Sequence, residues 1–171
     1  EEMAALKEII RLHPTYYPAL YHLGGLQVAT GQEAEGQNLL LKAVDLMAKR
    51  EDPATFEPKS MDNLIEFLGA NLRYDVARVF LERLIERYPR AAYFHDELGA
   101  TAVCLGDEVT AIAMARQAVE LAPQNAHFLS TLGWAHLAAG QLDEAEPHLK
   151  RSLALMPTNE VTKGNCEVLR H

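Results

Sequence analysis

The sequence has few of the residues that mark several protein classes. Two cysteines, Cys104 and Cys166, occur among 171 residues, which excludes a disulfide framework and the usual spacing of a thiolate zinc site. Aromatic residues make up 7% of the chain and include one tryptophan. No apolar run approaches the roughly 20 residues of a membrane-spanning helix, so no membrane insertion is expected. The low cysteine content fits a reducing compartment and favours a cytoplasmic location.

Basic residues are also few. The 16 Lys and Arg are outnumbered by 24 Asp and Glu, which gives a net charge of −8 and argues against binding to nucleic acid or anionic membranes. A chain that is 49% hydrophobic and 23% charged is typical of a globular protein with a sizeable core. Ala, Leu, Glu, Gln and Arg dominate, and this favours helices. Because the chain begins with Glu1-Glu2 rather than Met, we expect it to be a fragment of a longer protein.

A period of 34 residues organises the chain. It relates Pro89 to Pro123 and Pro157, Ala77 to Ala111 and Ala145, and Leu64 to Leu98 and Leu132. These signals predict four repeats, an insertion, a partial N-terminal unit and a C-terminal helix. Their ranges are 17–50, 58–91, 92–125 and 126–159 for the repeats, 51–57 for the insertion, 1–16 for the partial unit and 160–171 for the helix.

Each repeat has the pattern of two helices. In the last repeat, one face of the first helix carries Leu129, Leu132, Gly133 and His136. Gly140 then interrupts the pattern, and one face of the second helix carries Ala145, Leu149, Ser152 and Leu153. Small residues at matching places, such as Gly24, Gly99 and Gly133, are expected to let two helix backbones approach closely.

This pattern of Leu-Gly, Ala and a final Pro in a 34-residue unit resembles the tetratricopeptide repeat over residues 17–159. The resemblance implies an all-α fold, a right-handed α-solenoid of stacked antiparallel helix pairs that forms a single domain. Several positions depart from the pattern, among them the following three. Ile65 replaces a small residue, Gly36 replaces the usual Ala, and Ala48 replaces the final Pro.

The sequence offers no catalytic constellation. It contains no glycine-rich phosphate loop, no HExxH and no GxSxG motif. None of its seven histidines lies four residues from another histidine or a cysteine, so we expect no metal site and no cofactor. The two cysteines are expected to pack as small apolar residues. We therefore predict that the chain is not an enzyme.

The face of each first helix that points away from the packed seam is the candidate binding surface. A rotation of 100° per residue places repeat positions 2, 6, 9 and 13 on this face, with positions 5 and 12 beside it. In the family that the sequence resembles, this face lines a concave, peptide-binding groove. The residues predicted to form the groove are Tyr21, Asp62, Asn63, Glu66, Tyr93, Asp96, His127 and Trp134.

Each feature of this face has two readings. The acidic residues indicate either a field that favours a basic ligand or a solvated surface on an acidic protein. The aromatic residues are either anchors for a ligand or are covered by neighbouring side chains. Position 13 is always small, which leaves room for a ligand or lets helices crowd together; its residues are Ala29, Ala70, Cys104 and Ala138.

The leading hypothesis is a protein–protein interaction module that binds a peptide segment of a partner in an acidic, aromatic-containing groove, and a basic partner is favoured. Two alternatives remain: a structural or self-assembly spacer, and a substrate-docking domain of a larger enzyme. The chain is expected to be a monomer or to self-associate weakly. The groove lacks the Lys, Asn and Arg clamp with which some members of the family hold chaperone tails.

Overall fold

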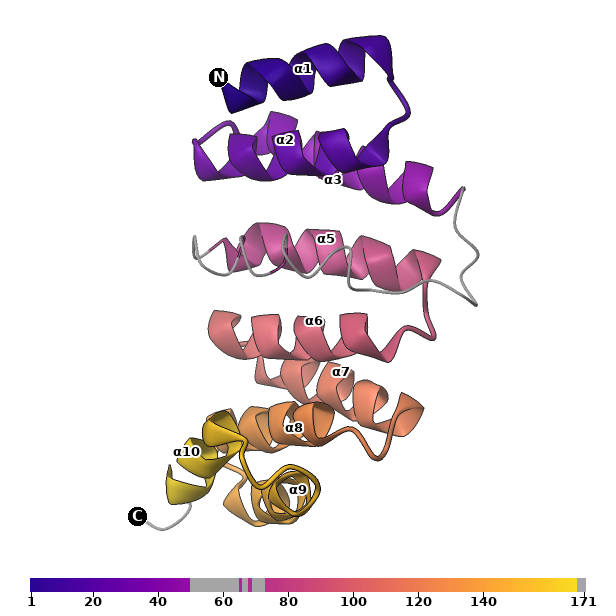
Figure 1. The fold of residues 1–171 in the computed structure, drawn as a ribbon. Coiled ribbons are helices and arrows are strands. Elements are labelled where there is room, and N and C mark those ends of the chain that lie inside the picture. Colours follow the sequence, from indigo (N-terminus) through magenta and orange to yellow (C-terminus); the bar gives the residue numbers. More distant parts are fainter. Residues whose placement is uncertain (50–64, 66–67, 69–72, 169–171) are drawn as a thin grey trace. The chain divides into compact units, whose positions relative to one another are not determined.

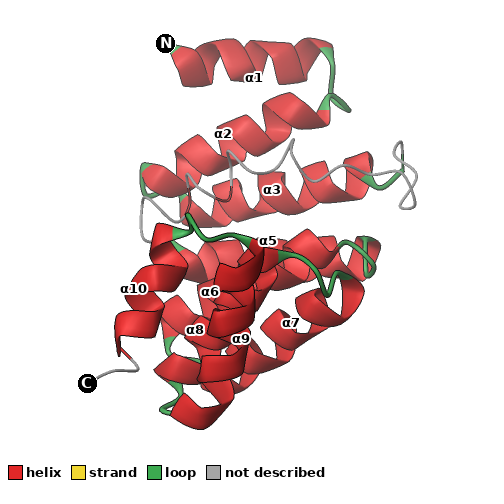
Figure 2. Ribbon diagram, turned by 60° about the horizontal axis from the view of Figure 1, so that its bottom comes forward, coloured by secondary structure: helices red, strands yellow, loops and turns green. Residues whose placement is uncertain are grey.

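The computed structural model describes residues 1–49, 65, 68 and 73–168, and every regular element within them is a helix (Figure 2). The predicted all-α fold of paired helices is therefore confirmed for this part of the chain. Packing divides the chain into two compact units, residues 1–89 and 90–171. The boundary falls between the second and third predicted repeats. The predicted insertion 51–57 lies outside the described residues.

Unit 1 contains a helical hairpin with one further described helix on each side of it in the chain (Figure 1). Helices α2 and α3 form the hairpin, α1 packs against α2, and α3 packs against α5. The bounds are Glu2–Leu12 for α1, Tyr17–Ala29 for α2, Glu33–Met47 for α3 and Tyr74–Arg87 for α5.

Unit 2 contains two successive hairpins and a terminal helix. Helices α6 and α7 form the first hairpin and α8 and α9 the second, and α8 contacts both α6 and α7. Helix α10 packs against α8 and α9. The bounds are Ala92–Leu105 for α6, Glu108–Leu121 for α7, Ala126–Ala138 for α8, Leu142–Leu155 for α9 and Glu160–Val168 for α10.

Local sequence signals explain where the helices of unit 2 begin and end. Gly106 follows α6 with a φ of 73°, a left-handed conformation that glycine adopts without a steric penalty. The Asp107 carboxylate then accepts a hydrogen bond of 3.1 Å from the Thr110 amide and caps α7. At the start of α8, the Asn125 side chain accepts one of 2.9 Å from the His127 amide. These caps fix the turns from which the hairpins extend.

The predicted apolar faces of the last hairpin form its core. Leu129, Leu132, Gly133 and His136 of α8 are all buried, as the 3.6-residue period predicts. On α9, Ala145, Leu149 and Ser152 are buried, whereas Leu153 is partly exposed. The two helices therefore bury their faces against each other and against the neighbouring helices of the unit.

The two helices of the first hairpin touch through their backbones. A Cβ atom added to Gly36 would lie 2.7 Å from Gly24 O and 2.9 Å from Val28 N, both below any real contact distance. A Cβ atom on Gly24 would lie 2.9 Å from Gly36 O. The departure at Gly36 therefore has a physical cause, because α2 and α3 leave no room for the Ala that the family pattern places there.

Helix α10 is joined to the last hairpin by buried hydroxyl groups. Thr162 Oγ1 donates to Ser130 Oγ at 2.7 Å and lies 3.2 Å from Ser152 Oγ. Ser152 Oγ in turn donates to the carbonyl of Ala126 at 2.6 Å. Because these hydroxyls satisfy one another out of contact with water, the network fixes where α10 lies on α8 and α9.

We predict that Gly36→Ala lowers the free energy of unfolding by about 1–3 kcal/mol, because backbone atoms cannot rotate away from the added methyl group. Urea unfolding followed by circular dichroism measures the change. Gly164→Ala is the control, since an added Cβ in α10 meets nothing within 4 Å and alanine favours the helix by about 0.5–1 kcal/mol. Wild-type stability of Gly36→Ala would contradict the close approach of α2 and α3.

Candidate peptide-binding face

A contact between the two first helices of unit 2 defines the candidate site. Asp96 Oδ2 on α6 lies 3.1 Å from His127 Nε2 on α8. Tyr93 lies one turn before Asp96 and Glu97 on α6, and Trp134 lies two turns after His127 on α8, so helical geometry places both aromatic residues on the same side as the contact. We call Tyr93, Asp96, Glu97, His127 and Trp134 the α6–α8 face.

Asp96 is the most buried polar group of this face. The sequence places it on the flank of an exposed surface, but its side chain is 0% exposed. Its Oδ1 atom accepts no hydrogen bond from any described residue. Removing a carboxylate from water costs on the order of several kcal/mol unless a cation or hydrogen-bond donors compensate. Asp96 therefore holds a negative charge where solvent screens it little.

His127 is the one described partner that compensates this charge. Its side chain is 63% exposed, and the Asn125 cap fixes its backbone in the first turn of α8. The hydrogen bond with Asp96 raises the pKa of His127, and the charges of Asp96 and Glu97 add to the effect against the opposing cost of burial. Protonation of the imidazole thus depends on both carboxylates.

Two aromatic side chains flank this charged centre. Tyr93 and Trp134 are both partly exposed, and the Tyr93 ring lies edge-on to Phe94 with centroids 5.8 Å apart. The small residues at position 13, Cys104 and Ala138, are exposed at the ends of α6 and α8. Neither side chain is therefore buried against a neighbouring helix.

Lys and Arg are absent from α6 and α8, and also from α2 of unit 1. The arginines of α5 are instead satisfied along their own helix and by α3. Arg78 pairs with Glu82 at 2.9 Å, and Arg83 with Glu86 at 2.9 Å. The α6–α8 face therefore carries two carboxylates, and neither α6 nor α8 supplies a Lys or Arg beside them.

The comparison with protein families decides what kind of repeat this is. Residues 105–162, from the end of α6 into α10, match the family model described as "Tetratricopeptide repeat". This part of the chain is therefore identified as tetratricopeptide repeat. The predicted family is thereby confirmed, and the contact between Asp96 and His127 joins the first helices of two successive repeats.

Solved tetratricopeptide repeat structures share the fold. The crystal structure of YrrB, described as a TPR protein with an unusual peptide-binding site, has a TM-score of 0.65 at 16% identity over 96% of this chain and 81% of that chain. The first TPR of Spaghetti (RPAP3), bound to the HSP90 peptide SRMEEVD, has a TM-score of 0.59 at 19% identity over 64% of this chain and 87% of that chain. The Sgt2 TPR domain from Aspergillus fumigatus has a TM-score of 0.61 at 16% identity over 68% of this chain and 78% of that chain.

Two further results are negative. None of the curated proteins matches the sequence. Within the described residues, no helix combines the length and the apolar character that crossing a membrane requires.

The other predicted groove residues belong to the first two repeats. Tyr21 on α2 is partly buried, its ring lies 4.4 Å from that of His22, and burial raises its pKa. Asp62, Asn63 and Glu66 lie outside the described residues. Their place in a groove stays a prediction, and the α6–α8 face is the part of the candidate site that the structure describes.

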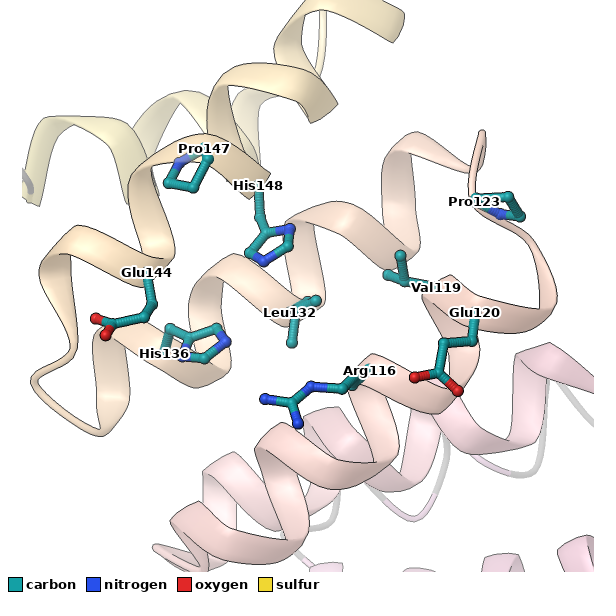
Figure 3. A pocket seen from close by; sticks show the side chains of 9 residues that line it. All are labelled: Arg116, Val119, Glu120, Pro123, Leu132, His136, Glu144, Pro147 and His148. Carbon is teal, nitrogen blue, oxygen red and sulfur yellow. The ribbon is translucent and has the colours of Figure 1, made fainter.

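A hollow that the sequence analysis did not predict opens between α7, α8 and α9 of the last two repeats. It has a volume of about 600 Å³, and His136 and His148 lie side by side in its wall (Figure 3). Their rings are nearly parallel, with centroids 5.8 Å apart, and His136 Nδ1 donates to Gln141 Oε1 at 2.8 Å. Its lining residues come from the second helix of one repeat and from both helices of the next, at positions that are not equivalent in the two repeats, so the 34-residue period did not locate it.

We predict that His148 titrates below the ordinary value of 6.5. Burial is the largest cause of its lowered pKa, and the charges of His136, Arg116 and Arg151 add to it. Because the folded state binds the proton less readily than the unfolded state, the stability that His148 contributes is present above about pH 6.5 and is lost as the pH falls through its lowered pKa.

Histidine ring signals in an NMR titration measure this pKa directly. The chain unfolded in urea is the matched control, and in it the midpoint should return to the ordinary value. A midpoint at or above 6.5 in the folded chain would show that the ring is hydrated and not buried against its neighbours.

Proposed function

We propose that the chain is a protein–protein interaction module and that its α6–α8 face binds a basic, extended peptide segment of a partner. The observation that carries the proposal is that two partly exposed aromatic side chains share one face with two carboxylates and with no Lys or Arg. Such a face offers apolar anchors together with charge selection, and no substrate is transformed.

The tetratricopeptide fold supports the peptide part of this proposal. The Spaghetti repeat is bound to the HSP90 peptide SRMEEVD, and YrrB is described by its peptide-binding site. The present chain has the same fold but the opposite preference in charge, because SRMEEVD carries three acidic residues that Asp96 and Glu97 would repel. A ligand rich in Lys or Arg is the complementary choice.

The aromatic residues would supply most of the binding energy. Tyr and Trp bury a large area at a low entropic cost, and binding energy concentrates on such residues near the centre of an interface. Tyr93 and Trp134 lie on either side of Asp96 and His127 along the helices, so a peptide crossing the face contacts an anchor at each end and a carboxylate between them. Tyr21 of the first repeat is a proposed further contact.

We expect a random peptide library selected on the whole chain to be enriched in Lys and Arg over Asp and Glu. The double variant Tyr93→Ala/Trp134→Ala should weaken binding of the best peptide by more than about 2 kcal/mol, measured by calorimetry. Tyr16→Ala removes an exposed aromatic ring outside the face and serves as the control. Acidic selected peptides, or unchanged affinity of the double variant, would rule this face out.

One observation favours self-association as a second function. Helix α1 buries none of its residues, and it and the following turn expose Ile9, Leu12 and Tyr16. A second copy could cover this apolar edge. We expect weak, concentration-dependent association in sedimentation equilibrium that Leu12→Glu abolishes, whereas Val109→Glu, at an exposed valine of unit 2, leaves it unchanged. A monomer at every concentration would exclude this function for the chain.

A further inference from the structure

The centre of the α6–α8 face brings together three side chains with the donor atoms of a metal site. One ligand atom from each of Asp96, Glu97 and His127 lies within 4.8 Å of the others. Asp96 Oδ2 and His127 Nε2 are 3.1 Å apart. Two ligands bound at about 2.0–2.1 Å in a tetrahedral site are separated by roughly 3.3 Å, so this pair needs almost no movement to share one ion.

The burial of Asp96 is an independent indication that a cation belongs here. The side chain is 0% exposed and directed at His127, yet Oδ1 accepts no hydrogen bond from any described residue. Buried polar atoms in folded proteins nearly always have a partner. His127 is the one ion-pair partner of Asp96 among the described residues, and it is charged only when protonated. A divalent cation would compensate the carboxylate whether or not protons are available.

The donor set selects among metal ions. One imidazole nitrogen with two carboxylates suits Zn²⁺, whereas Ca²⁺ and Mg²⁺ prefer sites made of oxygen alone. No cysteine belongs to the cluster, which disfavours the ions that need thiolate ligands. We propose that Asp96, Glu97 and His127 bind one Zn²⁺ ion, with water or a group of a bound peptide completing its coordination.

The three ligands sit on rigid elements. Asp96 and Glu97 occupy the middle of α6, between the buried residues His95 and Leu98. The Asn125 cap sets the first turn of α8 and so the position from which His127 reaches Asp96. The site therefore bridges the first helices of two successive repeats, and a bound ion would tie them together as a crosslink does.

Metal titration of the whole chain, untagged and freed of metal by chelation, tests the proposal. Calorimetry with Zn²⁺ alone should show one equivalent bound, and Co²⁺ should give the visible absorption of a bound ion. Substitution of a residue that only supports a metal ligand typically lowers metal affinity about 10–100-fold. Because His127→Gln and Glu97→Gln each remove a ligand, each should weaken Zn²⁺ binding at least tenfold. His22→Gln removes an exposed histidine of α2 and should have no effect.

His127 is exposed, so its replacement leaves the core of unit 2 intact and the test does not depend on the buried Asp96. Circular dichroism confirms that each variant is folded, and Asp96→Asn adds a third ligand variant. The proposal is overturned if Zn²⁺ does not bind, or if His127→Gln binds it as tightly as the wild type. None of these titrations contains a peptide, so their outcome is separate from that of peptide binding.

Discussion

The distance between paired helix backbones is the constraint on which the rest of the structure depends. In the first hairpin, Gly24 and Gly36 place the two backbones in direct contact; a Cβ atom on Gly99 would lie 3.0 Å from the Ala115 amide nitrogen of α7, and one on Gly133 would lie 2.5 Å from the Leu149 side chain of α9. In such a pair, one face of the first helix packs against the second helix. The opposite face of the first helix is not needed to hold the pair together. The α6–α8 face exists because of this division.

The centre of that face owes its properties to burial as well as to composition. The Asp96 side chain is buried, where its charge is weakly screened, whereas His127 remains in contact with solvent. The contact with Asp96 raises the pKa of the imidazole, and Oδ1 of the carboxylate accepts no hydrogen bond from any described residue. Tyr93 and Trp134 extend the surface along the helices, so the charged residues lie between two aromatic side chains.

The 34-residue period predicted the family, the paired helices and the buried residues of the last hairpin, because spacing and packing obey the same helical geometry. It also placed Tyr93, His127 and Trp134 on a face with exposed side chains. It did not predict the burial of Asp96, because a helical angle gives the direction of a side chain and not what covers it. Residue spacing along a single helix did not predict the cluster of Asp96, Glu97 and His127, because His127 lies almost a full repeat after the two carboxylates in the sequence.

Packing and recognition depend on different residues in these repeats. The backbone contacts involve glycines and alanines, whereas Tyr93, Glu97, His127 and Trp134 take no part in them. Substitutions at Tyr93 and Trp134 therefore leave the backbone contacts within the hairpins in place. A lineage could exchange one partner for another by a few surface substitutions, and a protein engineer could graft a new recognition sequence onto the same scaffold.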